Sequence, residues 1–390
     1  MPTRSIDSIA IVTSIHPDFD PRIWKHARSL AELGVETHLI CPWSSATSIR
    51  VPNLSIRVFP RVKSRVGRPM LIPPRVLREL LPLLRRVQII HFHDIDLLPW
   101  MTALCVFKPV VYDIHENYAE EMLVRGWIPN YLRRPLKWFV MAWHAGFPWL
   151  IRNLILAVPH QENEFRNPRL HKLLVYNYAS QRLLESFCDD YTSRPNRVIF
   201  TGSHYEDNGS ILLLEIAHRM QLRNVDADIW VTDRFASMQH REMFERGIIQ
   251  RKLRNLKIIP SVPSSEIMQL LAQATIGISP NLRIRKQELA IPTKLFEYMA
   301  AALPIVTSDL PYQRDLIMRH NAGLVAQPEN PDSFVSAIQQ LVNDRLLAES
   351  LGKNGQVAFK NYYTWEAQLP HLMSFYGQII SKINHRQSRC

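Results

Sequence analysis

Short runs of apolar residues alternate with helix-length segments along most of the chain. The first run, IAIVTS (9–14), is continuously apolar, as expected for a strand buried on both faces. A helical pattern follows from Pro21 to Leu33, with Gly34 as its stop. Further strands are predicted in this half at 35–42, 54–60, 87–94, 108–116 and 153–159. Apolar strands separated by helices indicate a parallel sheet covered on both faces.

A second strand–helix series begins after a break at about residues 178–196. Its predicted strands are 197–202, 226–232, 256–261, 275–279 and 303–309, with helices near 208–220, 264–273, 292–302 and 311–319. From Phe334 onwards the pattern is mostly helical. A chain of 390 residues with this pattern is expected to form two α/β domains, each a Rossmann-like, doubly wound sheet. Ligands bind outside the carboxyl ends of such strands, so a site is expected in a cleft where the two domains face each other.

The chain is basic, and the basic residues gather in its first half. Lys and Arg number 47 against 35 Asp and Glu, a net charge of +12. Residues 50–86 hold ten of the basic residues and a single acidic one, Glu79. This stretch is either a solvated face or a surface that meets anionic lipid headgroups. No zinc-finger, basic-zipper or RNA-binding signature accompanies it, so nucleic acid is not an expected partner.

The segment 131–158 is rich in tryptophan, and three basic residues, Arg133, Arg134 and Lys137, precede its apolar run. His144, Gly146 and Pro148 interrupt its apolar run, which argues against a spanning helix of about 20 apolar residues. An interfacial helix in the headgroup layer fits the composition. The alternative is a core-packed helix followed by a strand at 154–158.

The four cysteines are scattered without CxxC spacing, and the N-terminal residues do not form a secretory signal. We therefore expect a reduced, cytoplasmic protein, peripheral on the inner face of the plasma membrane.

The stretch 278–309 carries the most informative chemistry. Thr293 begins a predicted helix just beyond a strand's carboxyl end, where free N–H groups and the helix dipole could hold a diphosphate. Lys294 would add a charge, and Glu297 could accept hydrogen bonds from the hydroxyls of a ribose. The alternative is a surface i,i+3 pair between Lys294 and Glu297. The preceding loop offers further cations, at Arg283, Arg285 and Lys286.

Two further groups of polar residues follow predicted strands. His91, His93, Asp94 and Asp96 have a spacing that some metal sites use, but strand alternation sends the two histidines to one face and Asp94 to the other. We therefore expect His93 and Asp94 to shape a cleft, with a metal site as the alternative.

Asp20 and Arg22 flank Pro21 at the start of the first helix. They are either a cap and a solvated arginine, or groups near an acceptor hydroxyl and a diphosphate.

The segment PTKLFEYMAAALPIVTSD (292–309) resembles the donor-site motif of the retaining glycosyltransferases of family 4, which have the two-domain GT-B fold. Other segments resemble this family's polysaccharide-type members in the same order along the chain: HPDFDPR (16–22), HFHDIDLLP (91–99), YDIHE (112–116), VIFTGS (198–203) and YTWE (363–366).

The resemblance implies an acceptor-binding domain at 1–180, a donor-binding domain at 195–362 and a terminal helix, 363–390, that returns to the first domain. It implies transfer of a sugar from a nucleotide-diphosphate sugar to an acceptor hydroxyl with retention, without a metal or other cofactor. The basic stretch 50–86 and the tryptophan-rich segment both lie in the acceptor half, so we expect the acceptor to be a lipid-linked saccharide of a surface polysaccharide. The implied catalytic residues are His115, Asp20 and Lys294. The implied donor-binding residues are Gly202, Ser203, Arg283, Arg285, Glu288, Thr293, Lys294 and Glu297. The residues implied on the acceptor side of the cleft are His16, Arg22, His93, Asp94 and Glu116.

The sequence departs from the family pattern at three places. Leu289 stands where the motif has its first glutamate, with Glu288 one residue away. SHYEDNG (203–209) replaces a usual Arg and Lys pair, and Ala302 stands where glycine is usual. Two alternatives stay open beside the transferase. One is a nucleotide-sugar 2-epimerase of similar fold, and the other, which the missing first glutamate keeps open, is a non-catalytic membrane-associated scaffold.

Overall fold

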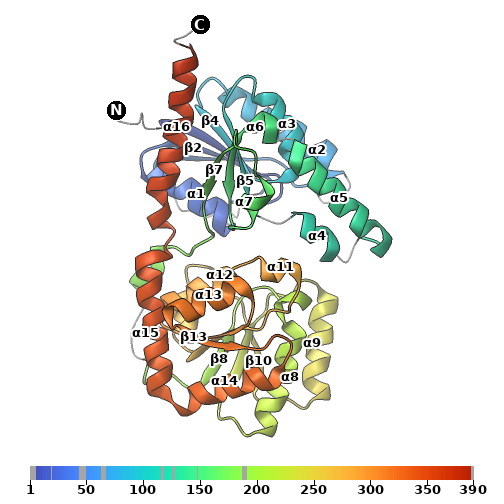
Figure 1. Cartoon of the computed structure of the whole chain (residues 1–390), viewed down its shortest axis with the longest axis vertical. Helices are drawn as coiled ribbons and strands as arrows, with labels where there is room; N and C mark the ends of the chain where they lie inside the picture. Colours follow the sequence, from blue (N-terminus) through green and yellow to red (C-terminus); the bar gives the residue numbers. More distant parts are fainter. Residues whose placement is uncertain are drawn as a thin grey trace. The chain divides into compact units, whose positions relative to one another are not determined.

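The computed structural model describes residues 6–18, 20–43, 50–62, 67–115, 118–124, 128–146, 148–186 and 191–387. The chain divides into two compact units (Figure 1). Unit 1 comprises Met1–Asn177 together with Trp365–Cys390, and unit 2 comprises Tyr178–Thr364. The chain thus leaves unit 1 once and returns to it for its last helix.

Unit 1 is built on a parallel sheet of seven strands. The strands lie in the order β3-β2-β1-β4-β5-β6-β7. Their bounds are β1 Ser8–Val12, β2 Glu36–Cys41, β3 Leu54–Val58, β4 Ile89–Phe92, β5 Val110–Ile114, β6 Asn153–Leu156 and β7 His171–Leu174. The order reverses between β1 and β4, and ligands of doubly wound sheets bind at the carboxyl ends of the strands at such a switch point.

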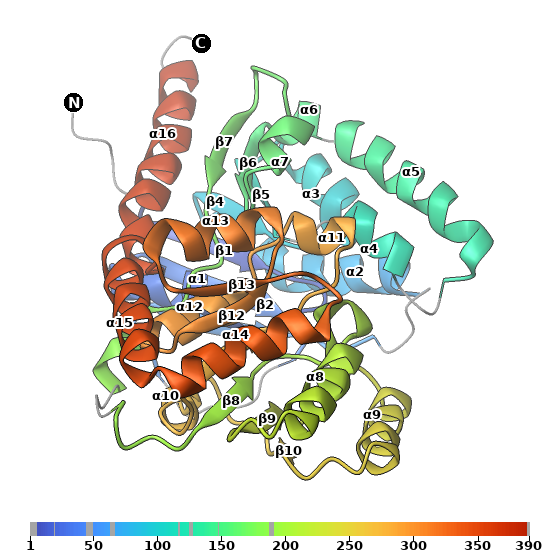
Figure 2. The same cartoon turned by 60° about the horizontal axis from the view of Figure 1, so that its bottom comes forward.

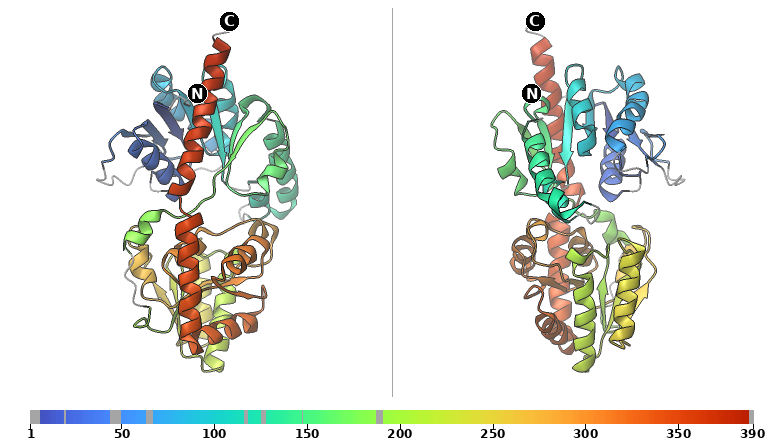
Figure 3. Two further views of the ribbon diagram at one scale, coloured as in Figure 1. Left: turned by 60° about the vertical axis from the view of Figure 1, so that its left-hand side comes forward. Right: turned by 90° about the vertical axis from the view of Figure 1, so that its right-hand side faces the viewer.

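Helices cover both faces of this sheet, because alternate residues of each buried strand point to opposite sides. Ile9 and Ile11 of β1 face α1 (Pro21–Glu32) and α16 (Leu369–Gln387). Ala10 and Val12 face the helices of the other side. These are α2 (Arg68–Leu80), α3 (Leu98–Leu104) and α6 (Pro148–Ile151), with the short 3-10 helices η1 (Leu81–Leu83) and η2 (Ile95–Leu97) between them in the chain. Figure 3 shows α16 running along its face of the unit 1 sheet.

Unit 2 repeats this architecture with six parallel strands in the order β10-β9-β8-β11-β12-β13. The strands are β8 Arg197–Phe200, β9 Asp228–Thr232, β10 Leu256–Ile259, β11 Ile276–Ser279, β12 Ile305–Ser308 and β13 Gly323–Ala326. The α-helices are α8 Ser210–Leu222, α9 Met238–Gln250, α10 Ile267–Leu271, α11 Arg285–Glu288, α12 Thr293–Ala300, α13 Pro311–His320, α14 Pro331–Asn343 and α15 Arg345–Tyr362. Unit 2 also contains the 3-10 helices η3 Gln181–Ser186 and η4 Glu206–Asn208, whereas η5 (Glu366–Gln368) belongs to unit 1. The switch point of unit 2 lies between β8 and β11. Figure 2 shows α8 and α9 beside the strands on the β8, β9 and β10 side.

All eleven predicted strands are present, within a few residues of their predicted ends. Sequence reasoning missed β7 and β13, which are edge strands of four residues each. β7 is only partly buried, so it lacks the continuous apolar pattern of a central strand. The fold class is therefore the predicted one, with two doubly wound parallel sheets.

The tryptophan-rich segment forms a helix that is only partly packed. α5 (Asn130–Gly146) packs against α4 (Tyr118–Val124) and precedes β6, while the short α7 (Gln161–Glu164) follows β6. Trp138 and Phe139 on α5 are 68% and 57% exposed. The alternative of a core-packed helix is thus wrong for these two side chains. Within the described residues, no helix combines the length and the apolar character needed to cross a membrane.

Candidate functional site

A carboxylate at the end of β4 holds the loop that follows β1. Asp94 Oδ2 accepts hydrogen bonds from Thr13 Oγ1 at 2.7 Å and from the Ser14 N–H at 2.6 Å. Its other oxygen lies 3.1 Å from His16 Nε2. Because β1 and β4 are neighbours at the switch point, the fold brings together residues about 80 positions apart in the chain. Asp94 therefore lies at the strand ends, as predicted, but it is buried and serves as an anchor for the loop.

His16 lies between two carboxylates. Its Nδ1 is 3.0 Å from Asp20 Oδ2, and its Nε2 contacts Asp94. Burial opposes a charged imidazolium, but the two carboxylates outweigh it and raise the pKa of His16 to about 11. The same contacts hold the pKa of Asp94 well below its usual range, against the cost of burial. His16 is therefore a cation at neutral pH.

Asp20 has the capping role that was one of its two predicted roles. Its Oδ1 accepts hydrogen bonds from the N–H groups of Arg22 and Ile23, at 3.0 and 3.3 Å, and so caps α1. Its second oxygen remains with His16, and 23% of the side chain is exposed.

Two more titratable groups complete this cluster. His115, just after β5, has its Nε2 3.3 Å from His16 Nε2. Asp96 accepts a hydrogen bond of 2.6 Å from Ser14 Oγ. Burial and the neighbouring charge of Asp94 raise the pKa of Asp96 to about 6, so this carboxyl exchanges protons near neutrality. In the sequence, Asp96 was a candidate only for the metal alternative. Glu116, predicted for the acceptor side, lies outside the described residues.

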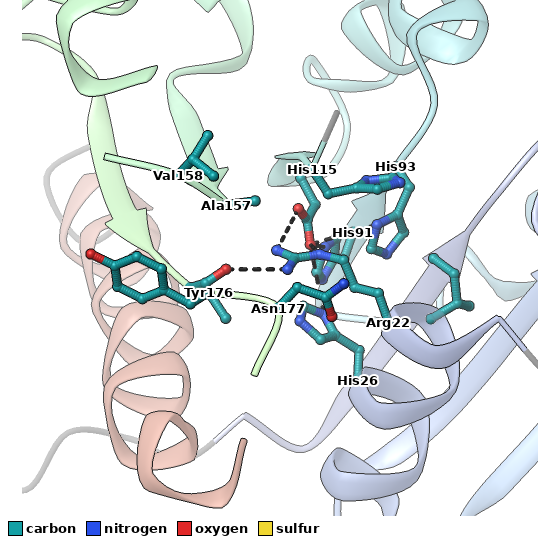
Figure 4. A network of polar contacts seen from close by, with 12 residues as sticks. Arg22, His26, His91, His93, His115, Ala157, Val158, Tyr176 and Asn177 are labelled. Atoms are coloured by element: carbon teal, nitrogen blue, oxygen red, sulfur yellow. Dashed lines mark hydrogen bonds and ion pairs between the residues drawn. The ribbon is translucent and has the colours of Figure 1, made fainter. Parts of the chain in front are cut away.

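Arg22 is not available to a diphosphate, contrary to the second prediction for its position. Its side chain is 2% exposed, and its guanidinium forms a two-pronged ion pair with Asp113 of β5, at 2.9 and 3.2 Å. A third bond runs from Nη1 to the Val175 carbonyl at 3.1 Å (Figure 4). A buried carboxylate needs such a partner, so the apolar strand that contains Asp113 already carried a signal that sequence reasoning missed.

His93 was expected to shape a cleft, but it points into the interior of unit 1. The side chain is fully buried, and its Nδ1 lies 3.5 Å from Asp113 Oδ2. His91 and His26 face the same oxygen, at 3.4 and 3.9 Å (Figure 4). Strand alternation placed His91 and His93 on one face as predicted, and their partner on that face is Asp113.

In unit 2, a tyrosine sets the position of α12 over the switch point. The hydroxyl of Tyr298 accepts a hydrogen bond from the Thr201 N–H at 2.9 Å and donates to the Ile199 carbonyl at 3.2 Å. The ring fits because residue 277 is glycine, where a Cβ would come within 2.4 Å of it. The N-terminus of α12 therefore lies beside the carboxyl end of β8, and Pro292 provides no side-chain cap for it.

Lys294, in the first turn of α12, is a buried cation. The side chain is 9% exposed, so the surface-pair alternative is wrong for this residue. Its Nζ lies 4.0 Å from the centre of the Phe200 ring, and among the described residues it has no ion-pair partner within 4 Å. Burial lowers the pKa of Lys294 to about 7, although the charges of Glu297 and Asp207 act in the opposite direction. An anion placed here would restore its charge.

Four other predicted donor-site residues lie around Lys294. Gly202 follows β8 with φ of 110°, a left-handed conformation that favours glycine, and a Cβ there would be 4.0 Å from Lys294 Cδ. Glu297, one turn further along α12, is half-buried. Thr293 is the first residue of the helix. Ser203 follows Gly202, and its carbonyl accepts a bond from Asn208 at 2.9 Å.

The basic loop before α12 has a different arrangement at each cation. Lys286 pairs with Asp207 at 3.1 Å, and Arg283 donates to the Asp309 carbonyl at 2.9 Å. Arg285 is 65% exposed and lies 4.0 Å from Glu288. Arg285 is thus the freest of the three to reach a ligand. Asp207, the partner of Lys286, lies in the segment 203–209, which replaces the family's Arg and Lys pair.

The last departure from the family pattern has a clear conformational consequence. Ala302 follows α12 with φ of 52°, in the left-handed region that glycine adopts without strain. The backbone therefore keeps the conformation expected of the usual glycine.

Two family models match the two halves of the chain. Residues 22–160 match the model described as "Glycosyltransferase Family 4", and residues 195–344 match "Glycosyl transferases group 1". With two doubly wound units, the chain has the GT-B fold. It belongs to the family 4-type glycosyltransferases, as the sequence resemblance predicted.

Among curated proteins, the chain is 18% identical over 213 residues to an uncharacterized glycosyltransferase, MJ1178, of Methanocaldococcus jannaschii. The match covers 55% of each protein, so the chain spans about half the length of this relative.

Solved structures of similar fold cover nearly the whole chain. A sucrose-phosphate synthase from Thermosynechococcus elongatus has a TM-score of 0.76 at 13% identity, over 96% of this chain and 100% of its own. WaaG, a glycosyltransferase involved in lipopolysaccharide biosynthesis, has a TM-score of 0.68 at 12% identity, and the match covers 94% of this chain and 99% of WaaG. Anabaena HepE in complex with UDP-glucose has a TM-score of 0.69 at 11% identity, and the match covers 97% of this chain and 99% of HepE. At these identities the likeness establishes the fold.

Proposed function

We propose that the chain is a retaining hexosyltransferase that moves a sugar from a nucleotide-diphosphate sugar, bound by unit 2, to a lipid-linked saccharide bound by unit 1. The observation that carries this proposal is Lys294. It is a buried ammonium with no ion pair among the described residues, placed at an uncapped helix N-terminus beside the end of β8. Such a site favours a bound diphosphate. The UDP-glucose complex of HepE, which has a similar fold, supports a nucleotide-sugar donor.

In this proposal the leaving diphosphate is stabilised without a metal. Lys294 and the N–H groups of the first turn of α12 face the charge that grows as the sugar departs. Glu297 holds the ribose hydroxyls, and Arg285 adds a contact to the phosphates. The leaving phosphate itself takes the acceptor proton. His115 and Asp20 act on the side of the transferred sugar and the acceptor.

A thermal-shift screen of nucleoside diphosphates and nucleotide sugars, with EDTA present, tests the donor site. A ligand at about 100 times its Kd should add about 2.7 kcal/mol of stability. We expect a shift with one nucleotide in EDTA and its loss in Glu297→Ala and Lys294→Met. The variant Lys257→Met alters an exposed lysine elsewhere in unit 2 and serves as the control. A shift that needs a divalent ion would overturn the metal-free donor site, and no shift with any nucleotide would overturn the function.

Product chemistry tests the reaction. Proton NMR of the product should show the anomeric configuration of the donor sugar. An inverted product would exclude the retaining mechanism. Release of a free 2-epimer would identify an epimerase, and donor binding without turnover on any lipid-linked acceptor would identify a scaffold.

We also propose that unit 1 attaches to the inner face of the plasma membrane, where a lipid-linked intermediate of a surface polysaccharide would be met. The support is α5, which exposes Trp138 and Phe139 beside the exposed Arg134. Exposed aromatic rings and basic residues on one helix are typical of binding in the headgroup layer. WaaG, which has a similar fold, is involved in lipopolysaccharide biosynthesis, and this supports the polysaccharide assignment.

Vesicle co-sedimentation tests the attachment. Binding to vesicles with anionic lipid should exceed binding to neutral vesicles and should fall in the double variant Trp138→Ala, Phe139→Ala. Trp100 of α3 is 43% exposed in the same unit, so Trp100→Ala is the matched control. Equal binding by the double variant and the control would refute the role of α5.

A further inference from the structure

Three histidines and an aspartate of unit 1 are arranged as the ligands of a metal ion. Their ligand atoms, one each from His26, His91, His93 and Asp113, all lie within 4.8 Å of one another. All four side chains are fully buried. His26 comes from α1 and the other two histidines from the end of β4 (Figure 4). Asp113 belongs to β5.

The contacts of Asp113 with His91 and His93 match the spacing of ligands around one metal ion, whereas His26 lies farther out and would move inward to bind the same ion. The three imidazoles lie 3.4, 3.5 and 3.9 Å from Asp113 Oδ2. In a tetrahedral zinc site with bonds of about 2.0–2.1 Å, neighbouring ligand atoms lie about 3.4 Å apart. In contrast, His16 in the same unit contacts its two carboxylates at 3.0 and 3.1 Å, the range of ordinary hydrogen bonds.

The imidazoles also have unsatisfied nitrogens. Both ring nitrogens of His26 and of His93, and Nε2 of His91, are buried without a hydrogen-bond partner among the described groups. One metal ion would take one nitrogen from each of the three rings, and buried polar atoms in folded proteins usually have such a partner.

The surroundings give two of the four residues, His91 and Asp113, the second layer of contacts that metal ligands usually have. Nδ1 of His91 is hydrogen-bonded to the Tyr376 hydroxyl at 2.7 Å, which leaves Nε2 to face Asp113. The Arg22 guanidinium is bonded to both oxygens of Asp113. This cation already offsets the carboxylate charge, so the site relies on imidazole nitrogen. Hard ions such as Mg²⁺ and Ca²⁺ are therefore disfavoured relative to Zn²⁺ and its neighbours.

We propose that His26, His91, His93 and Asp113 bind one divalent transition-metal ion of the zinc class as a closed structural site inside unit 1. Four protein ligands leave no open position for a substrate, which distinguishes a structural from a catalytic site. The ion would tie α1 to the ends of β4 and β5, and through Tyr376 to α16. It is separate from the proposed metal-free donor site of unit 2.

Metal content tests the site directly. Protein produced with Zn²⁺ and then dialysed against a chelating resin should retain about one equivalent by mass spectrometry. Protein produced with Co²⁺ should show the intense visible bands of four-coordinate cobalt. The variants His91→Asn and His93→Gln should lose both signals. His144 is a buried histidine of the same unit, bonded to Tyr112, and His144→Gln should keep them.

X-ray absorption of the zinc-loaded wild type keeps the proposal testable if the variants do not fold. It should show four nitrogen or oxygen neighbours, with the outer-shell scattering of imidazole. Wild-type protein that folds with far less than one equivalent of metal would overturn the proposal, and so would metal retained by folded His91→Asn or His93→Gln. Nucleotide binding is measured separately in EDTA, so failure of the metal site leaves the donor-site proposal standing.

Discussion

Lys294 offers a quantitative test of the donor site through the pH dependence of nucleotide-sugar binding. The pKa of Lys294 is lowered to about 7 in the free protein, because the side chain is buried against Phe200 and Gly202. A bound diphosphate would stabilise the ammonium and raise this pKa towards the ordinary value. Binding then requires the charged lysine, and it takes up a proton whenever the free lysine is neutral.

The size of the effect follows from that pKa. The charged fraction of the free lysine falls from about nine-tenths at pH 6 to about one-tenth at pH 8. The apparent affinity should therefore fall about tenfold over this range, or about 1.4 kcal/mol. At pH 8 each binding event should take up about 0.9 proton. Burial lowers the pKa of the nearby His204 to about 4, so this histidine does not change charge between pH 6 and 8.

Isothermal titration calorimetry with a nucleotide-diphosphate sugar measures both quantities. Both phosphates of such a ligand are esterified, so its charge stays constant from pH 6 to 8. Proton uptake is obtained by repeating the titration in buffers of different ionisation enthalpy. Lys294→Met should bind more weakly and lose the pH dependence, whereas Lys286→Met, which removes a lysine already paired with Asp207, should keep it. Wild-type affinity that is flat from pH 6 to 8, without proton uptake, would refute the reasoning about Lys294.

Three further predictions concern stability. Asp113→Asn leaves the Arg22 guanidinium buried without its carboxylate and should cost about 3–5 kcal/mol in urea unfolding; a cost below about 1 kcal/mol would contradict this. The pKa of His16 is raised from 6.5 to about 11, so its ion pairs should stabilise the fold fully below pH 6.5, and this contribution should be lost as the pH rises to 11. The free energies of unfolding of wild type and His16→Gln should therefore approach each other from pH 6 through pH 8 to pH 10. A constant difference would argue against the ion pairs. Gly209→Ala would place a Cβ 1.8 Å from the Pro280 carbonyl oxygen and should strongly lower the temperature of the calorimetric transition of unit 2. Gly34→Ala, also at positive φ but with nothing within 4 Å, should cost only about 1 kcal/mol. Equal effects of the two variants would show that backbone strain, and not the contact with Pro280, causes the loss of stability.

The repeating pattern of the chain was sufficient to predict both sheets. Central strands such as β1 and β11 are fully buried and read as continuous apolar runs. The cap at Asp20 and the first-turn proline after it are local signals, so the start of α1 was predicted at the correct residue. β7 and β13 were missed because short edge strands carry little of this periodic signal.

The candidate site was predicted in part. The position of Lys294 at a helix start beside a strand end follows from the order of elements, but its burial does not. That burial depends on the Phe200 ring and on the tyrosine that fixes α12, which come from other elements. Arg22 shows the reverse case, because a residue expected to meet a ligand was instead needed inside unit 1 by Asp113.

The alternation of strands and helices, the two-unit organisation and the family follow from the sequence alone, because they depend on local periodicity, caps and short motifs. Which polar side chains meet follows only from the three-dimensional fold. Arg22 and Asp113 are 91 residues apart, and His91 and Tyr376 are 285 apart. The physical reason is that these pairings depend on strand order. A reversal between β1 and β4 brings the ends of distant segments together, and no local pattern encodes which segments become neighbours.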